Sequence, residues 1–283
     1  METISPVHER IGHSADSENF IVSPQLQAMV NLDKITTNGK ALFLAYDQGM
    51  EHGPSDFDDE SVDPNYILDI GVKGGFNAVI FQKGVAEKYY PSSLRSSGQV
   101  PSIPLILKLN GKTNLVENID PYSPLLCTVD EAIHLGAVAV GYTVYVGSEF
   151  ENKMTKEFAN IAREAHEKNL PVVGWMYPRG KSLESRNPRE VSAYGARLGL
   201  ELGADIIKMK YPGNFKDLEW MVESAGKTKL VISGGAKENE EEFLAMAKTA
   251  MRAGAIGMAV GRNIWQNKNP LEITKKLKEI IFT

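Results

Sequence analysis

Eight short apolar runs, rich in β-branched residues, alternate along the chain with amphipathic segments that have helical spacing. Apolar runs of about four to eight residues are typical of buried strands. Strands that alternate with helices indicate βαβ units and a parallel sheet. Helices are expected, among other places, over 156–169, 188–203, 239–254 and 269–282. The eight strands are expected at residues 41–47, 78–82, 104–109, 137–143, 171–177, 205–211, 229–235 and 255–261.

Eight such units in 283 residues predict an α/β fold, a single (β/α)8 TIM barrel. An open, doubly wound sheet is the alternative, and we favour the barrel because no shift in composition marks a domain boundary. The barrel is expected over residues 38–283. It follows an N-terminal extension, residues 1–37, in which residues 23–32 form a short helix that closes the barrel bottom. Residues 91–102 precede a strand and are expected on the face opposite the catalytic one.

Composition limits the classes of partner. The net charge of −5 argues against broad nucleic-acid binding, which needs a basic face. The start of the chain has no apolar core of a secretory signal, and no apolar run approaches the ~20 residues of a membrane span. Cys127 is the single cysteine, so no intramolecular disulfide forms. We therefore expect a cytoplasmic protein that binds neither nucleic acid nor membrane.

Two lysines interrupt the sixth apolar run. Lys208 and Lys210 are two residues apart, so on a strand they point to the same face. Strand lysines commonly reach solvent or form ion pairs. Alternatively, burial and a nearby cation disfavour the charged form, and the neutral amine attacks a carbonyl to form a Schiff base. Lys210 is nearer the strand end, so it is predicted to be the nucleophile, with Lys208 as its cationic neighbour.

Other polar residues stand where strands are expected to end. Tyr177 closes the fifth strand and is a candidate general acid or base, although core packing also accounts for an aromatic there. Asp47 closes the first strand as a candidate carboxylate, with a turn cap as the alternative. In the loops that follow, His52 and Arg179 are either ligand contacts or solvated residues.

The last two strands end in glycine-bearing segments. Barrels often bind phosphate at these ends through backbone N–H groups, which glycine lets approach the oxygens. Arg262 adds a charged donor. The histidines show no close pair at metal-ligand spacing, so we expect neither a metal site nor a cofactor. The predicted phosphate site comprises Ser233, Gly234, Gly235, Gly261 and Arg262.

Taken together, these segments resemble the archaeal-type class I fructose-1,6-bisphosphate aldolases, a family also found in bacteria. The similarity covers residues 38 to 282, nearly all of the chain. The motifs that carry it occur in the family's order: AYDQGMEHGP, FQKGVAEKYY, LILKLNGKT, GYTVYVGS, WMYPRG, ELGADIIKMKYPG, ISGGAK and AVGRNIWQ.

The resemblance implies a (β/α)8 barrel that reversibly cleaves fructose 1,6-bisphosphate to dihydroxyacetone phosphate and glyceraldehyde 3-phosphate, with a Schiff-base lysine and no metal. It implies Lys210 as that lysine, Tyr177 as the proton donor and Asp47 as the active-site carboxylate. The chain has Gln48 where the family usually has His; Gln hydrogen-bonds but does not shuttle protons near neutral pH. The implied substrate contacts are Gln48, His52, Asp56, Trp175, Arg179, Lys208 and the phosphate site.

Two alternatives remain open. A relative in the superfamily makes 2-amino-3,7-dideoxy-hept-6-ulosonate with a similar lysine, but the LKLNGKT and EHGP segments favour the bisphosphate aldolase. A sugar-phosphate-binding barrel without catalysis would keep the glycines and lose the lysine or the tyrosine, and both are present. The family commonly forms large homo-oligomers, so a homo-oligomer is expected.

Overall fold

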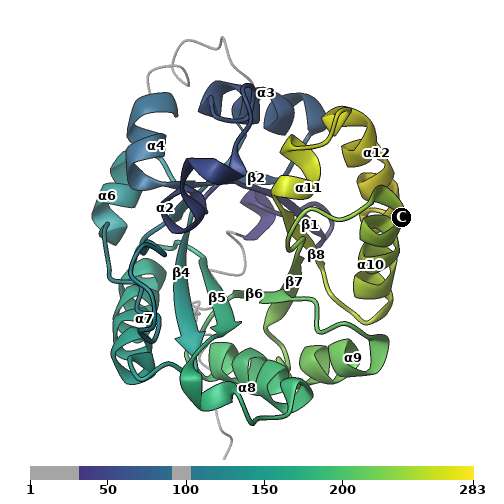
Figure 1. The fold of residues 1–283 in the computed structure, drawn as a ribbon. Coiled ribbons are helices and arrows are strands. Elements are labelled where there is room, and N and C mark those ends of the chain that lie inside the picture. Colours follow the sequence, from purple (N-terminus) through teal and green to yellow (C-terminus); the bar gives the residue numbers. More distant parts are fainter. Residues whose placement is uncertain (1–31, 91–102) are drawn as a thin grey trace, which may run out of the picture.

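Eight parallel strands form a closed barrel, in sequence order, with helices around it (Figure 1). The structure, a computed structural model, describes residues 32–90 and 103–283. Closure between β1 and β8 confirms the predicted TIM barrel and excludes the open sheet. The strands are β1 (Ala41–Ala45), β2 (Ala78–Gln82), β3 (Leu105–Lys108), β4 (Ala139–Val146), β5 (Val172–Pro178), β6 (Ile206–Lys210), β7 (Lys229–Ser233) and β8 (Gly257–Val260).

The helices begin at residues suited to that position. Side chains of Asp63, Thr128, Asn187, Asn214 and Asn239 each accept a hydrogen bond from a backbone N–H of the first turn. The larger helices are α3 (Pro64–Gly74), α4 (Lys83–Tyr89), α6 (Val129–His134), α7 (Glu151–Glu167), α8 (Pro188–Glu201), α9 (Phe215–Ser224), α10 (Glu240–Arg252) and α12 (Pro270–Ile281). Shorter helical turns are η1 (Leu32–Lys34), α2 (Gly49–His52), η2 (Gly53–Asp56), η3 (Lys181–Leu183) and α11 (Arg262–Trp265).

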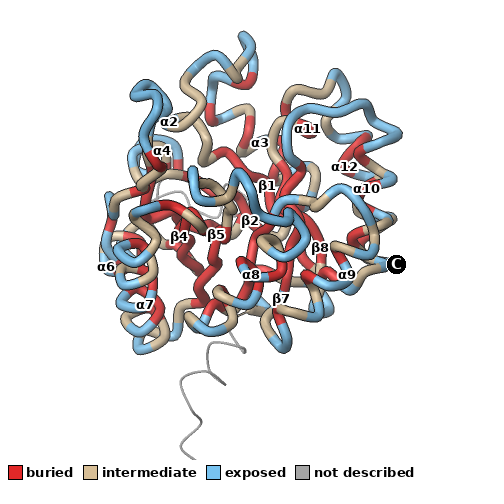
Figure 2. Tube along the Cα trace, turned by 60° about the horizontal axis from the view of Figure 1, so that its bottom comes forward, coloured by how far each residue is buried: buried red, intermediate tan, exposed pale blue. Residues whose placement is uncertain are grey.

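The strands are buried on both faces, because one face lines the barrel and the other meets the helices (Figure 2). Inside the barrel, side chains such as Phe43, Ile80, Val173 and Val231 form a core of their own. A larger cluster fills the space between strands and helices. Lys108 and Lys208 are also almost fully buried inside, each 5–6% exposed. The lower barrel is therefore a packed core, and polar side chains enter it only toward the carboxyl ends.

Strand β4 extends to Val146, three residues beyond the expected end at 143, because it stays in register with β5 up to the pair Val146 and Pro178. The other expected strands differ from the observed ones only at their ends. The helix expected at 23–32 lies almost wholly outside the described residues, as does the segment 91–102, and the domain boundary at residue 38 stays a prediction. Among the described residues, no helix has the length and apolarity required to cross a membrane.

One glycine makes room for the largest side chain inside the barrel. Trp175 on β5 is 1% exposed. A Cβ added to Gly141 on the neighbouring β4 would lie 1.9 Å from an atom of the Trp175 ring. Any side chain at residue 141 therefore displaces the indole.

We expect Gly141→Ala to lower the free energy of unfolding by about 1–3 kcal/mol, the usual cost of overpacking a core. Chemical denaturation measures the change. Gly84→Ala in α4 is the matched control, since its Cβ would meet no atom within 4 Å and its φ is not positive. Equal stability of the two variants would contradict the packing role of Gly141.

Candidate active site

A cavity of about 240 Å³ opens at the carboxyl ends of the strands, where the catalytic face was expected. All but one of the predicted site residues line it. The exception is Asp56, which contacts two of the lining residues, His52 and Arg262. The predicted residues that line the cavity are Asp47, Gln48, His52, Trp175, Tyr177, Arg179, Lys208, Lys210, Ser233, Gly234, Gly235, Gly261 and Arg262.

At the bottom of the cavity, one carboxylate and two lysines surround an indole ring. The Nζ of Lys108 lies 3.5 Å from Oδ2 of Asp47. The Nζ atoms of Lys108 and Lys208 each lie 5.1 Å from the centroid of the Trp175 ring, within the range of cation–π attraction. The indole therefore contributes to holding two ammonium groups that are almost fully buried.

Burial shifts the protonation equilibria of this cluster. Desolvation lowers the pKa of Lys208 and of Lys108, and the attraction of Asp47 only partly opposes it. For Asp47, burial raises the pKa, but Lys208 and Lys108 outweigh it and leave the pKa below its usual value. Asp47 is therefore ionised at neutral pH, and the lysines have a larger neutral fraction than an exposed lysine.

Lys210 lies higher, at the rim of the cavity. In the sheet register it is level with Ser233, whereas Lys208 is level with Trp175 and Val231. Desolvation lowers the pKa of Lys210, and the charges that lower it further are those of two arginines, Arg179 and Arg262. Lys208 is not among the charges that shift the pKa of Lys210, since it interacts electrostatically with Asp47 one step deeper, and its role as the cationic neighbour stays a prediction.

Tyr177 lies beside the buried carboxylate. It is on β5, partly buried and packed against the barrel core. Burial raises the pKa of its phenol and the charge of Asp47 raises it further, while Ser233 opposes the change. The phenol therefore stays protonated over the physiological range, as a proton donor requires.

The glycine-bearing ends of β7 and β8 form one wall. Gly235 has a φ of 68°, in the left-handed region that favours glycine. Asn263, 4% exposed, donates from Nδ2 to the carbonyls of Gly234 and Ala236 at 2.7 and 2.9 Å. Arg262 donates to the Gly235 carbonyl at 3.1 Å. These bonds fix the loop beside a cation, an arrangement suited to phosphate.

The loop after β1 supplies a carboxylate to each arginine of the cavity. Glu51 on α2 forms an ion pair with Arg179, and Asp56 in η2 lies 3.4 Å from Arg262. The loop also brings Gln48, whose Nε2 is buried and has no hydrogen-bond partner among the described residues, as is the case for Nε1 of Trp175. Two buried donors without a partner therefore belong to residues that line the cavity.

Sequence reasoning missed several residues of this site. Lys108 stands inside an apolar strand just as Lys208 does, so the argument applied to β6 also identifies it. Glu51 and Asn263 carried no comparable signal, because their roles depend on ion pairs and hydrogen bonds between distant loops. Among residues 32–90 and 103–283, no group of three or more His, Cys, Asp and Glu side chains is arranged to hold a metal ion.

Comparison with known proteins places this geometry in a family. The family described as DeoC/LacD family aldolase matches residues 41–267. The class 1 fructose-bisphosphate aldolase of Thermoproteus tenax is 49% identical over 247 residues, 86% of this chain and 90% of that protein. The Halobacterium salinarum R1 protein of the same name is 43% identical over 250 residues, 88% of this chain and 92% of its own.

Solved structures agree. An archaeal fructose-1,6-bisphosphate aldolase, with its catalytic lysine covalently bound to the carbinolamine intermediate of the substrate, has a TM-score of 0.83 and 46% identity. The match covers 91% of this chain and all of that one. A fructose-bisphosphate aldolase from Slackia heliotrinireducens has a TM-score of 0.83 at 29% identity, covering 94% of this chain and 89% of that one. The chain therefore belongs to the DeoC/LacD family of aldolases.

Proposed function

We propose that this chain is a class I fructose-bisphosphate aldolase, which reversibly cleaves fructose 1,6-bisphosphate to dihydroxyacetone phosphate and glyceraldehyde 3-phosphate through a Schiff base. The observation that carries the proposal is the buried cluster of Lys208, Asp47 and Tyr177 beneath a wall suited to phosphate. The names of the T. tenax and H. salinarum relatives support the same reaction. On composition and family resemblance, we further propose a cytoplasmic homo-oligomer.

The geometry favours Lys208, rather than Lys210, as the Schiff-base lysine. Lys208 is 5% exposed, so desolvation acts on its amine more fully than on that of Lys210 at the rim. It also shares an electrostatic neighbour with Tyr177, because the charge of Asp47 acts on both groups. Lys210 lies level with Ser233, where its charge faces the proposed phosphate site.

In the proposed reaction, the neutral amine of Lys208 attacks the C2 carbonyl, and loss of water gives a protonated imine. A base removes the proton of the C4 hydroxyl, the C3–C4 bond breaks, and its electron pair moves into an enamine. Glyceraldehyde 3-phosphate leaves. Protonation at C3 and hydrolysis of the imine then release dihydroxyacetone phosphate and the free lysine.

Tyr177 is assigned one of these proton transfers, and Asp47 is assigned a supporting electrostatic role. Tyr177, protonated and next to the cluster, supplies the proton at C3. Asp47, ionised and buried, accepts a hydrogen bond from a substrate hydroxyl and stabilises the positive imine. Arg262 and the segment Ser233–Gly235 hold one phosphate of the substrate. Arg179, in the turn after β5, holds the other phosphate.

Borohydride reduction with dihydroxyacetone phosphate tests the lysine assignment. We expect Lys208→Met to abolish both the trapped adduct and cleavage. We expect Lys210→Met to keep the adduct and raise KM for fructose 1,6-bisphosphate roughly 10-fold or more, the usual effect of losing a charged hydrogen bond worth about 1.5–3 kcal/mol. Tandem mass spectrometry should locate the adduct of the unaltered protein on Lys208.

The opposite pattern, with the adduct lost only in Lys210→Met, would return the role of nucleophile to Lys210. No adduct in the unaltered protein would contradict the Schiff-base mechanism itself and favour a non-catalytic sugar-phosphate-binding barrel.

Removing the proposed proton donor should separate imine formation from turnover. We expect Tyr177→Phe to keep the borohydride adduct and lower kcat by ~10²–10⁴-fold, the typical contribution of general acid–base catalysis. Tyr142→Phe is the control, because it removes a buried hydroxyl that hydrogen-bonds Glu157 at 2.6 Å, away from the cavity. A kcat of Tyr177→Phe within threefold of the unaltered protein would remove Tyr177 from the chemistry.

Removing metal ions with a chelator tests whether the imine, rather than a metal, accepts the electrons of the breaking bond. Since the protonated imine accepts the electrons of the breaking bond, exhaustive EDTA treatment should leave the cleavage rate unchanged. The rate is measured with a coupling enzyme that consumes the triose phosphates. A blank with the same EDTA concentration corrects for any effect of EDTA on the coupling enzyme. Loss of activity that zinc restores would mean that a metal, not the lysine, polarises the ketone.

A further inference from the structure

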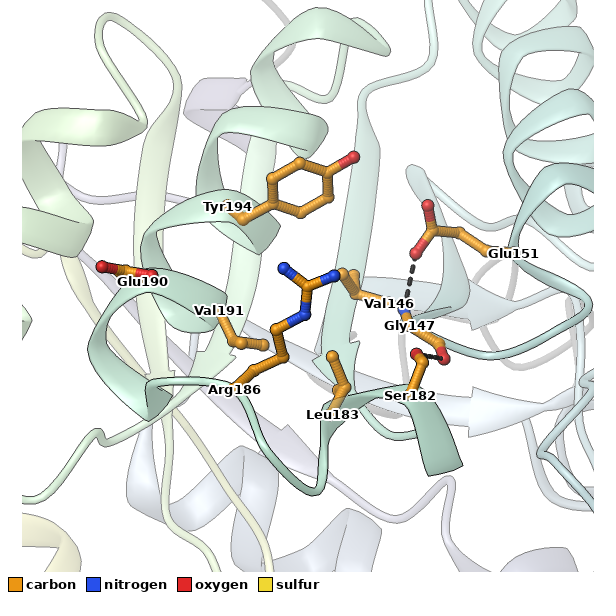
Figure 3. A pocket seen from close by; sticks show the side chains of 9 residues that line it. All are labelled: Val146, Gly147, Glu151, Ser182, Leu183, Arg186, Glu190, Val191 and Tyr194. Atoms are coloured by element: carbon orange, nitrogen blue, oxygen red, sulfur yellow. Dashed lines mark hydrogen bonds between the residues drawn. The ribbon is translucent and has the colours of Figure 1, made fainter.

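A second cavity, of about 350 Å³, lies outside the barrel mouth (Figure 3). It is an open surface hollow, lined by the end of β4, the start of α7, the turn after β5 and the first turns of α8, and Arg186 in it is exposed. None of its lining residues lines the active-site cavity. The proposed aldolase reaction makes no use of this space, so its chemistry has to be considered separately.

The cavity combines apolar walls with one cationic group. Val146, Leu183 and Val191 form the walls, and the guanidinium of Arg186 extends between them toward Tyr194 (Figure 3). Among the described parts of the chain, no carboxylate lies within ion-pair distance of Arg186 and no hydrogen bond engages its side chain. Figure 3 shows the Glu190 carboxylate directed away from it.

The other acidic group of the cavity has a partner. Glu151 accepts a hydrogen bond from the backbone N–H of Gly147 at 2.5 Å, so it is fixed at the turn after β4. Arginine is always charged and presents planar, paired donors that match carboxylate and phosphate oxygens. The phenol of Tyr194, on a side chain that is largely exposed, offers a further donor at the entrance.

The wall of this cavity is bonded to the segment that carries Arg179 of the active site. The backbone N–H of Arg179 donates to the Val146 carbonyl at 3.0 Å, and the Ser182 hydroxyl donates to the Gly147 carbonyl. A Cβ on Gly180 would lie 2.0 Å from the Gly147 carbonyl oxygen, so the two turns are packed without space between them. A ligand against Val146 and Leu183 therefore bears on the backbone of Arg179.

We propose that this cavity binds a small organic anion, a carboxylate or a phosphate monoester with a short carbon chain, through Arg186, and that its binding changes the affinity of the active site through Arg179. Binding of the anion at Arg186 does not depend on the proposed aldolase function. The effect of that binding on the active site rests on the proposed function.

Calorimetric titration of the full chain tests the binding step, with succinate as the carboxylate probe and glycerol 3-phosphate as the phosphate probe. Because glycerol 3-phosphate also fits the proposed phosphate site of the active-site cavity, only binding that depends on Arg186 counts for the second cavity. We expect Arg186→Gln to weaken binding of at least one probe 10-fold or more. The control is Arg197→Gln, which removes an exposed arginine of α8 that pairs with Glu201, and it should bind like the unaltered protein.

The two probes identify the anion, since loss of succinate binding alone indicates a carboxylate site and loss of glycerol 3-phosphate binding alone a phosphate site. No binding of either probe, or equal affinities in the unaltered protein and Arg186→Gln, would overturn the proposal. Circular dichroism confirms that both variants are folded.

Steady-state kinetics then test the coupling step. With the bound probe at saturation, we expect KM for fructose 1,6-bisphosphate to change at least threefold in the unaltered protein and in Arg197→Gln, with kcat little changed. Arg186→Gln should show only the KM change that competition at the active site produces, and an equal change in the two proteins would overturn the coupling. An unchanged KM alongside confirmed binding would overturn the coupling, whereas absence of any cleavage would count against the proposed function and leave the calorimetric result standing.

Discussion

Placing two ammonium groups inside a closed barrel is the constraint on which this site depends. Removing an unpaired charge from water costs several kcal/mol even after relaxation. The protein offsets the cost for Lys108 and Lys208 with one carboxylate, Asp47, and with the face of Trp175 at 5.1 Å from each Nζ. Desolvation still lowers the pKa of both lysines, because the attraction of Asp47 only partly opposes it. The same burial therefore raises the neutral fraction of the two amines above that of an exposed lysine.

The packing inside the barrel accommodates this cluster of two lysines, Asp47 and Trp175. Trp175 fits only because Gly141 on the neighbouring strand has no side chain, and its Nε1 remains without a partner. Below this level the interior is filled by residues such as Ile106 and Val173, which exclude water from the lysines. The Trp175 ring, the absence of a side chain at Gly141 and the apolar residues below therefore act together to keep the Lys208 amine desolvated. Stability and reactivity are determined by the same packing.

The sequence predicted the barrel and most of the residues that line the cavity. Strand period fixes which side chains point inward and strand order fixes which ends meet, whereas Gln48 and Trp175 were expected from the family resemblance alone. The sequence did not predict how deep each side chain lies. Lys208 and Lys210 share a face, yet one is level with Trp175 and the other with Ser233. Nor did it predict that Glu51 reaches Arg179, since ion pairs between loops depend on backbone paths that no local pattern encodes.

Each of the two arginines at the cavity already has a carboxylate as its partner. Arg179 and Arg262 face the cavity, and each meets a carboxylate from the loop after β1, Glu51 or Asp56. These carboxylates neutralise charge that would otherwise be uncompensated without an anion. Arginine has five donors in a planar fork, so a phosphate either adds to such a pair or takes the place of its carboxylate. In the proposed function, a phosphate that takes the place of Glu51 or Asp56 releases a carboxylate of the loop after β1. Because Asp47 stands at the start of that loop, the proposed phosphate sites and the buried lysine cluster are connected through it.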